Sequence, residues 1–218
     1  QGDIRVIPHG VNKNFFNKNK DQYPIEQYNE ENPYEIVYVS IIDVYKHQWI
    51  VAEAVNILKK KSYPVKLSLI GPKVKFAYEK LTRKLLEIEN SKDFLNYLGP
   101  IEYSDLPKVY QKFDLGIFAS SCENMPNILV EMMASGIPIV CSKKDPMPEI
   151  LGKNGNFFCP EEPEMLASII EELMLDPTKR RDSIKFSYEK VKEYSWDRCS
   201  KETLSFIREV SENYVKKT

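Results

Sequence analysis

The chain has 218 residues, of which 31 are basic and 32 acidic, for a net charge of −1. This length suits one large domain or two small ones, and it is enough to bury a core without metal or disulfide staples. The near-neutral balance provides no global field for nucleic acid, and 42% hydrophobic residues with 8 Gly and 14 Pro exclude collagen, low complexity and wholesale disorder.

Six short apolar runs, each typical of a β-strand, alternate with amphipathic stretches. In chain order the runs are Glu35–Ser40, Val65–Ile70, Phe94–Leu98, Leu115–Ala119, Ile137–Cys141 and Asn156–Cys159. The intervening segments carry apolar residues at i, i+3, i+4 and i+7, as between Val51 and Leu58, which predicts helices. One of them follows Ser104, a candidate N-cap, and another begins near Pro126.

The spacing of these runs predicts the fold class. Successive strands begin 19 to 30 residues apart, which leaves room for a crossover helix and too much chain for a hairpin. We therefore expect an α/β, Rossmann-like three-layer sandwich with a mostly parallel six-stranded sheet. Further helices are expected after the last strand, the final one from Trp196. Residues 1–34 do not fit the alternation and are expected to form a linker or irregular arm.

The cysteines and histidines show no metal-binding pattern. The four cysteines are far apart, no C-x-x-C pair occurs, and the chain has only His9 and His47. The sequence predicts reduced thiols in a cytoplasmic protein, and no metal site. No apolar run approaches the roughly eighteen residues of a membrane span.

Ligands of open parallel sheets bind beyond the carboxyl ends of the strands, so the loops there are the candidate site. The first such loop, Ile41–Lys46, has no glycine, which excludes the dinucleotide fingerprint and the P-loop and disfavours a dehydrogenase. Lys46 at the start of the following helix suits a phosphate group, although a solvated surface lysine is the alternative.

The loop after the fourth strand is the richest in candidate residues. Glu123 precedes a helix that begins near Pro126, and Glu131 lies within that helix, one turn beyond Asn127. Carboxylates accept hydrogen bonds from hydroxyls and a helix N-terminus holds an anion, so the pattern predicts a site for a polyol attached to a phosphate. Two solvated glutamates are the alternative.

The motif from Glu123 through Glu131 to Val140 resembles the signature of retaining family-4 glycosyltransferases of the GT-B fold. The resemblance covers nearly the whole chain, because further landmarks of that family occur in order: Val6–Asn12, Ser40–Lys46, Tyr97–Ile101, Asp105–Asp114, Pro148–Ile150 and Tyr194–Trp196. It implies an enzyme that transfers a hexose from a UDP- or GDP-linked sugar to an acceptor hydroxyl, in polysaccharide or glycolipid synthesis, with no metal required.

The resemblance also implies site residues. Glu131 would bind the ribose hydroxyls, Glu123 would lie against the transferred sugar, and Lys46 would neutralise the diphosphate. The remaining donor-binding positions would supply backbone N–H groups to the sugar (Asn124, Met125) and to the diphosphate (Asn127, Ile128), or would lie in the loops after the second and third strands (Gly71, Ile101).

Two positions depart from the family pattern. Ile41 stands where the family usually has an arginine, so that leaving-group stabilisation would depend on Lys46, the helix end, or another cation such as Lys73 or Lys143. Pro126 has no N–H to donate, so contacts to the sugar are expected to differ in detail.

The resemblance divides the chain into a hinge arm from an N-terminal domain (1–34), a donor-binding domain (35–194) and a C-terminal helix packing back toward the hinge (195–218). The acceptor-binding domain would belong to the same polypeptide, and this part alone would be inactive. From Pro177 to Thr218 the chain has 11 basic and 7 acidic residues, which predicts contact with the inner face of a membrane if the acceptor is a lipid, or else a solvated helix pair. Two further alternatives stay open: a noncatalytic nucleotide-binding module and an interaction domain without a ligand.

Overall fold

The computed structural model describes residues 4–215, and these contain a six-stranded sheet with every neighbouring pair parallel. The strand order is β3-β2-β1-β4-β5-β6, so the order reverses between β1 and β4. The strand bounds are β1 Tyr34–Val39, β2 Val65–Ile70, β3 Leu95–Gly99, β4 Leu115–Phe118, β5 Ile139–Ser142 and β6 Asn156–Phe158. This is the doubly wound order of Rossmann-like folds.

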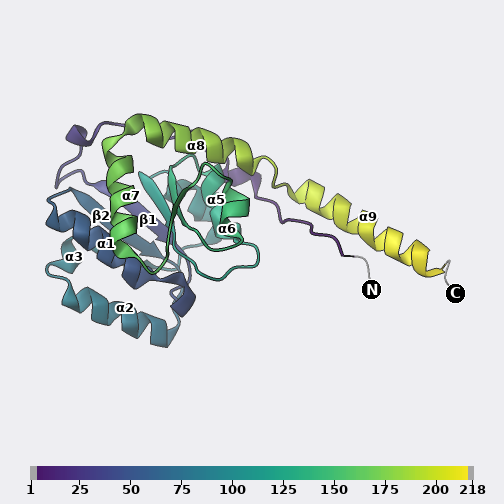
Figure 1. Ribbon diagram of the computed structural model, residues 1–218, viewed down its shortest axis with the longest axis horizontal. Helices are drawn as coiled ribbons and strands as arrows, with labels where there is room; N and C mark the ends of the chain where they lie inside the picture. Colours follow the sequence, from purple (N-terminus) through teal and green to yellow (C-terminus); the bar gives the residue numbers. More distant parts are fainter. Residues whose placement is uncertain (1–3, 216–218) are drawn as a thin grey trace.

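Helices cover both faces of the sheet (Figure 1). One face carries α1, α2 and α7, which pack together, and the other carries α5, α6 and α8. The helix bounds are α1 Gln48–Lys60, α2 Lys75–Glu87, α3 Ser91–Phe94, α4 Leu106–Tyr110, α5 Asn127–Ala134, α6 Met147–Leu151, α7 Pro163–Leu175, α8 Pro177–Val191 and α9 Trp196–Val215. Because both faces are covered, the inner strands β4 and β5 are buried along their whole length rather than at alternate residues.

The predicted α/β three-layer class and its parallel sheet are confirmed, and each strand lies within two residues of its apolar run. The prediction that Ser104 is a helix N-cap is wrong. Ser104 does not cap a helix, because it lies inside a 3₁₀ helix, Tyr103–Asp105, that leads into α4. The short helix α3, directly before β3, was not predicted.

The segment before β1 is irregular, with two 3₁₀ turns, yet part of it is fastened to the domain. Phe15 is buried in the core, and Lys20 forms an ion pair of 2.8 Å with Asp114. The buried guanidinium of Arg180 donates to the side chain of Gln22 at 2.7 Å and to the carbonyl of Met174 at 2.6 Å. Residues 15–22 therefore pack as part of the folded unit.

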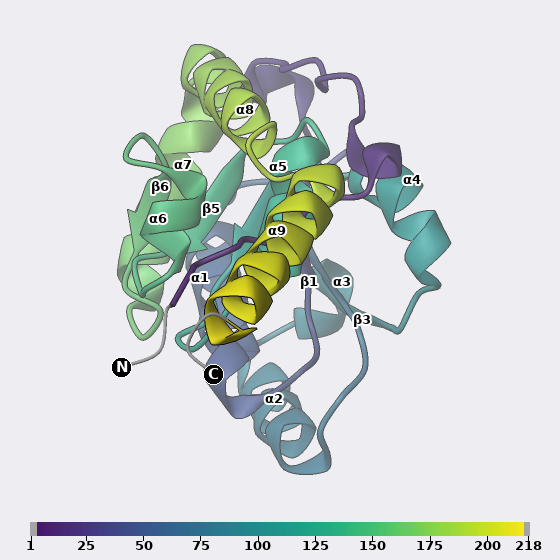
Figure 2. The same cartoon turned by 90° about the vertical axis from the view of Figure 1, so that its right-hand side faces the viewer.

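The helix α9 extends away from the sheet (Figure 1) and lies beside residues 5–9 (Figure 1, Figure 2). Arg5 pairs with Glu209 at 2.8 Å, and the ring of His9 stacks on Trp196 with centroids 5.3 Å apart. A Cβ on Gly10 would lie 2.0 Å from the backbone nitrogen of Trp196, so the two segments cross in direct contact. None of the helices within residues 4–215 combines the length and the apolar character needed to cross a membrane.

Candidate functional site

A pocket of about 220 Å³ opens at the carboxyl ends of the strands, where the strand order reverses. It is lined by the ends of β1 and β2 and by the loops that follow β1, β2 and β3, together with the first turn of α5. Four of the predicted site residues meet there: Lys46, Gly71, Ile101 and Ile128. The switch point of such a sheet is where this fold binds its ligands.

The loop after β1 is held in a defined shape by its own polar groups. The carboxylate of Asp43 accepts from the N–H of Val44 at 2.7 Å and opens a 3₁₀ helix that ends at Lys46. The buried hydroxyl of Tyr38 donates to the carbonyl of Lys46 at 2.9 Å, and the side-chain amide of Gln48 donates to the carbonyl of Ile41 at 2.8 Å. These bonds fix the backbone from which the Lys46 side chain extends.

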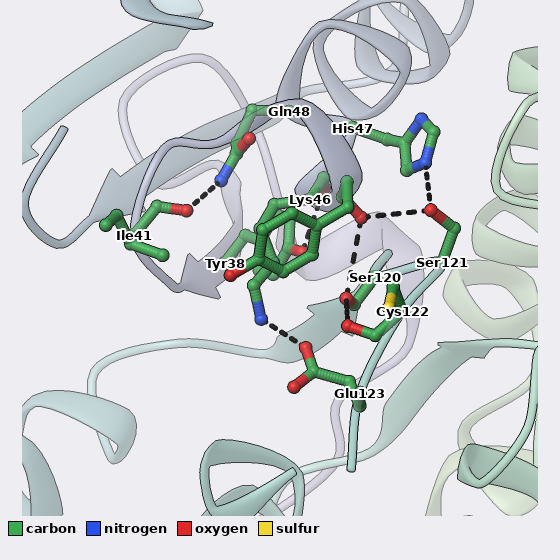
Figure 3. Close-up of polar contacts among 10 residues, drawn as sticks. Tyr38, Ile41, Lys46, His47, Gln48, Ser120, Ser121, Cys122 and Glu123 are labelled. Atoms are coloured by element: carbon green, nitrogen blue, oxygen red, sulfur yellow. Dashed lines mark hydrogen bonds and ion pairs between the residues drawn. The ribbon is translucent and has the colours of Figure 1, made fainter. Parts of the chain in front are cut away.

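The loop after β4 is fastened to the loop after β1. The backbone N–H of Ser121 donates to the carbonyl of Tyr45 at 2.8 Å, and the Ser121 hydroxyl lies 2.8 Å from Nε2 of His47. The Ser120 hydroxyl donates to the carbonyl of Cys122 at 3.2 Å. Figure 3 shows the side-chain contacts around the two loops, which these hydrogen bonds hold together.

The side chains of Lys46 and Glu123 meet across these two loops. Nζ of Lys46 forms an ion pair with Oε1 of Glu123, with side-chain exposures of 8% and 15% (Figure 3). The Lys46 ammonium also lies 5.3 Å from the ring centre of Phe118, in β4. The structure thus places both predicted catalytic residues in contact with each other beside the pocket.

Glu131 lies in the second turn of α5 and is 6% exposed. Its Oε1 accepts from the hydroxyl of Tyr103 at 2.7 Å, while its buried Oε2 has no hydrogen-bond donor among residues 4–215. Burial raises the pKa of the Glu131 carboxyl, and the Tyr103 hydrogen bond opposes that shift. Such an acceptor is typical of a group that binds a hydroxyl-bearing ligand.

Gly71 is required by a close approach of two backbones. Its φ of +140° is unfavourable for other residues, and a Cβ would lie 2.2 Å from the carbonyl oxygen of Ser40. The N–H of Gly71 donates to the carbonyl of Gly99 at 2.9 Å, and the Tyr97 hydroxyl donates to the Gly71 carbonyl at 2.9 Å. The contact holds the loops after β1, β2 and β3 together at the pocket wall.

Three predicted donor contacts lie differently from the expectation. Asn124 and Met125 line a separate pocket of about 590 Å³, together with Pro8 and His9 of the N-terminal segment. The N–H of Asn127, expected to be free, donates to the carbonyl of Met125 at 3.0 Å, because the chain turns at Pro126 before α5 begins. The side-chain oxygen of Asn127 instead lies 3.1 Å from Nδ1 of His9.

Neither substitute cation lines the pocket. The ammonium of Lys73 lies 3.7 Å from the ring centre of Tyr78, and Lys143 is exposed. Ile41 itself contributes to the pocket lining. Lys46 is therefore the cation that this pocket offers from its own lining. Within the described chain, no three His, Cys, Asp or Glu side chains gather as a metal site would require.

Tyr103 was missed by the sequence analysis. The residue carries no motif, and its contact with Glu131 depends on the 3₁₀ turn that replaced the expected cap at Ser104. A tyrosine two residues after Ile101 is the only signal that the sequence contains.

The fold and the pocket define an α/β protein with a ligand site at the switch point of a parallel sheet. Residues 19–190 match the family model described as glycosyl transferases group 1, so the chain belongs to that family. The glycosyltransferase family with a GT-B-like fold, predicted from the Glu123–Val140 motif, is thus confirmed.

Proteins similar to this chain in sequence or in structure are consistent with this family assignment. The probable sucrose-phosphate synthase of Thermosipho melanesiensis is 30% identical over 216 residues, covering 94% of this chain and 47% of that protein. Anabaena Alr3699/HepE, crystallised in complex with UDP, superposes with a TM-score of 0.79 at 19% identity, covering 94% of this chain and 57% of that one. The C-terminal domain of the glycosyl transferase group 1 protein LpcC from Francisella tularensis superposes with a TM-score of 0.69 at 21% identity, covering 84% and 97%. The segments that align with this chain cover 21% to 47% of the length of these curated relatives.

Proposed function

We propose that this chain is the donor-binding domain of a retaining glycosyltransferase of the hexosyltransferase type, which takes its sugar from a UDP- or GDP-linked donor. The observation that carries the proposal is the pocket at the switch point, which is lined by Lys46, Gly71, Ile101 and Ile128. The UDP complex of the HepE neighbour supports a nucleoside diphosphate as the ligand of this fold.

In this proposal, the diphosphate lies between Lys46 and the start of α5. An ammonium group and the positive end of a helix both stabilise an anion. As the acceptor oxygen bonds to the anomeric carbon, the bond from that carbon to the diphosphate breaks; negative charge grows on the leaving group, which takes up the proton of the acceptor hydroxyl. Lys46 stabilises that charge, and the acceptor replaces the diphosphate on the same face of the sugar.

The ribose and the sugar are assigned to the two carboxylates. Glu131 accepts hydrogen bonds from the ribose hydroxyls, because it is buried in α5 one turn beyond Ile128 of the pocket lining and has an oxygen without a donor. Glu123 lies against the transferred sugar, where the backbone of Asn124 and Met125 also contributes. The nucleobase lies on the side of Gly71 and Ile101.

The acceptor site is assigned to an N-terminal domain of the same polypeptide. The aligned segments cover less than half of the curated relatives, and a group 1 C-terminal domain superposes on this chain over 97% of its own length. Residues 1–34 would then be the arm from that domain, with α9 packing beside it. This chain binds the donor but transfers no sugar by itself. A cytoplasmic location and contact with a membrane surface stay predictions.

Calorimetry with UDP-, GDP-, ADP- and CMP-linked sugars tests the proposal. We expect a UDP- or GDP-linked sugar to bind most tightly, and the Glu131→Gln variant to weaken that binding. No binding of any member of the panel at millimolar concentration would contradict the function. Sugar transfer by residues 1–218 alone would contradict the two-domain assignment.

A further inference from the structure

Tyr103 occupies the carboxylate that the proposed donor needs. Its hydroxyl donates to Oε1 of Glu131 at 2.7 Å, and Oε2 of Glu131 is sealed from solvent without a donor. A ribose presents two neighbouring hydroxyls, which bind a carboxylate through both of its oxygens. In this structure, Oε1 of Glu131 already accepts a hydrogen bond from Tyr103, and Oε2 is buried, so neither oxygen is open to a ribose.

We propose that Tyr103 is a displaceable plug of the ribose site, whose hydroxyl must leave Glu131 before a ribonucleotide binds. The inference rests on the proposed function, since it concerns the same carboxylate. It assigns to Tyr103 a contact that is present without nucleotide and broken with it. A positioning residue would keep its hydrogen bond in both states.

The surroundings of Tyr103 suit a side chain that moves. The residue is 52% exposed and belongs to a 3₁₀ helix of three residues, Tyr103–Asp105, at the edge of the loop after β3. Its ring packs on the buried ring of Phe15, with centroids 5.4 Å apart and tilted by 52°. Rotation of the ring away from Glu131 would break the hydrogen bond to that carboxylate and the aromatic contact with Phe15.

The carboxylate, by contrast, cannot follow the tyrosine. Glu131 lies in α5 between Val130 and Met132, both of which are buried in the core. The helix α5 packs against α6 and α8, so its backbone is fixed from the side opposite the sheet. The tyrosine is therefore the partner that yields.

Breaking a contact before binding has a thermodynamic consequence. The free protein is stabilised by the Tyr103 hydrogen bond, whereas the complex is not, so the bond opposes binding. Removal of the hydroxyl lowers the stability of the free protein and strengthens nucleotide binding. These opposite signs separate a plug from a merely structural tyrosine.

The test uses Tyr103→Phe, which keeps the ring on Phe15 and removes only the hydroxyl. By calorimetry, we expect UDP to bind about three- to tenfold more tightly than to the wild type, the range of one modest net hydrogen bond. The thermal midpoint without nucleotide should fall. With 2′,3′-dideoxy-UDP, which has no hydroxyls to replace the tyrosine, the gain should be absent.

Tyr97→Phe is the matched control. It also removes a hydroxyl beside the pocket, one that donates to the Gly71 carbonyl, but no ribose competes for that acceptor. This variant should lose stability without any gain in UDP affinity. Unchanged or weaker UDP binding by Tyr103→Phe would overturn the plug while UDP binding by the wild type upheld the proposed function. Failure of the wild type to bind any nucleoside diphosphate would overturn both.

Discussion

The ammonium of Lys46 and the carboxylate of Glu123 form an ion pair that joins the loop after β1 to the loop after β4. These loops are 77 residues apart in the chain, and they meet because β1 and β4 are neighbours where the strand order reverses. The pair neutralises two side chains that are mostly buried. The pair holds the Lys46 ammonium beside the pocket, and an ammonium has further N–H groups with which to contact a diphosphate.

Lys46→Gln should weaken UDP binding by about ten- to hundredfold, because it removes charge-assisted contacts worth about 1.5–3 kcal/mol. The affinity of the same variant for uridine, which has no phosphate, should fall by no more than about threefold, as measured by displacement calorimetry. Lys73→Gln is the control, since the Lys73 ammonium lies over the Tyr78 ring outside the pocket lining. An equal loss for uridine, or a larger effect from Lys73→Gln, would refute the phosphate role.

Replacing each of the two carboxylates, Glu131 and Glu123, with glutamine should have different effects on UDP binding. Glu131→Gln should weaken UDP binding by about ten- to hundredfold, because the ribose loses a charged acceptor. Glu123→Gln should leave UDP affinity within about threefold, since its partner is the sugar, yet reduce turnover in the full-length enzyme. Glutamine and glutamate have similar helix propensities, so α5 should persist in the first variant. If both variants bind UDP as the wild type does, the ribose assignment is wrong.

The stability of the protein without nucleotide should depend on Glu131 and on pH. Burial raises the pKa of the Glu131 carboxyl above its ordinary 4.5, so its protonated form is favoured by folding. That contribution is fully present below pH 4.5 and is lost as pH rises through the raised pKa of the folded state. Glutamine does not titrate, so Glu131→Gln should gain stability relative to the wild type as pH rises.

Urea unfolding of both proteins at intervals between about pH 4 and pH 8 measures this difference. The variant's substitution penalty is the same at every pH, so only the trend matters. A difference in unfolding free energy that stays constant over this range would show that Glu131 is not destabilised by its burial.

Gly71→Ala should destabilise the protein by about 3 kcal/mol or more, since it combines a disfavoured φ with a backbone clash. The new Cβ would lie 2.2 Å from the Ser40 carbonyl oxygen. Gly99→Ala is the control, because Gly99 has a φ of +76° with nothing within 4 Å of an added Cβ. It should cost about 1–2 kcal/mol, the strain of a left-handed residue alone. Thermal unfolding of both variants checks that Gly71→Ala lowers the melting temperature more than Gly99→Ala does. Equal decreases in melting temperature would contradict the close approach of Gly71 to Ser40.

The sequence predicted the sheet well because each strand lies in a short, mostly apolar run, and the central strands are buried. It also identified Lys46 and Glu123 separately, since both follow predicted strands. Their ion pair was not predicted, because it depends on the exact path of the two loops, which the hydrogen bonds of Ser121 to Tyr45 and His47 define. Local pattern alone contains no such long-range information.

The N-terminal arm and the 3₁₀ helix Tyr103–Asp105 are two further features that local sequence patterns did not reveal. Phe15 is a single aromatic residue in an Asn- and Lys-rich segment, so nothing periodic marks it as part of the core. Ser104 has the residue type of a cap, but the bond from the Asp105 N–H to the Glu102 carbonyl at 2.9 Å forms a tighter turn instead. That turn directs Tyr103 to Glu131.

A crystal structure of the protein in complex with UDP tests the account most directly. We expect that structure to show the ribose hydroxyls bound to the Glu131 carboxylate and the diphosphate between Lys46 and the first turn of α5 at Ile128. We also expect the Tyr103 hydroxyl to have moved away from Glu131. A nucleotide seated instead in the pocket lined by His9 and Asn124, with the Tyr103–Glu131 contact unchanged, would contradict it.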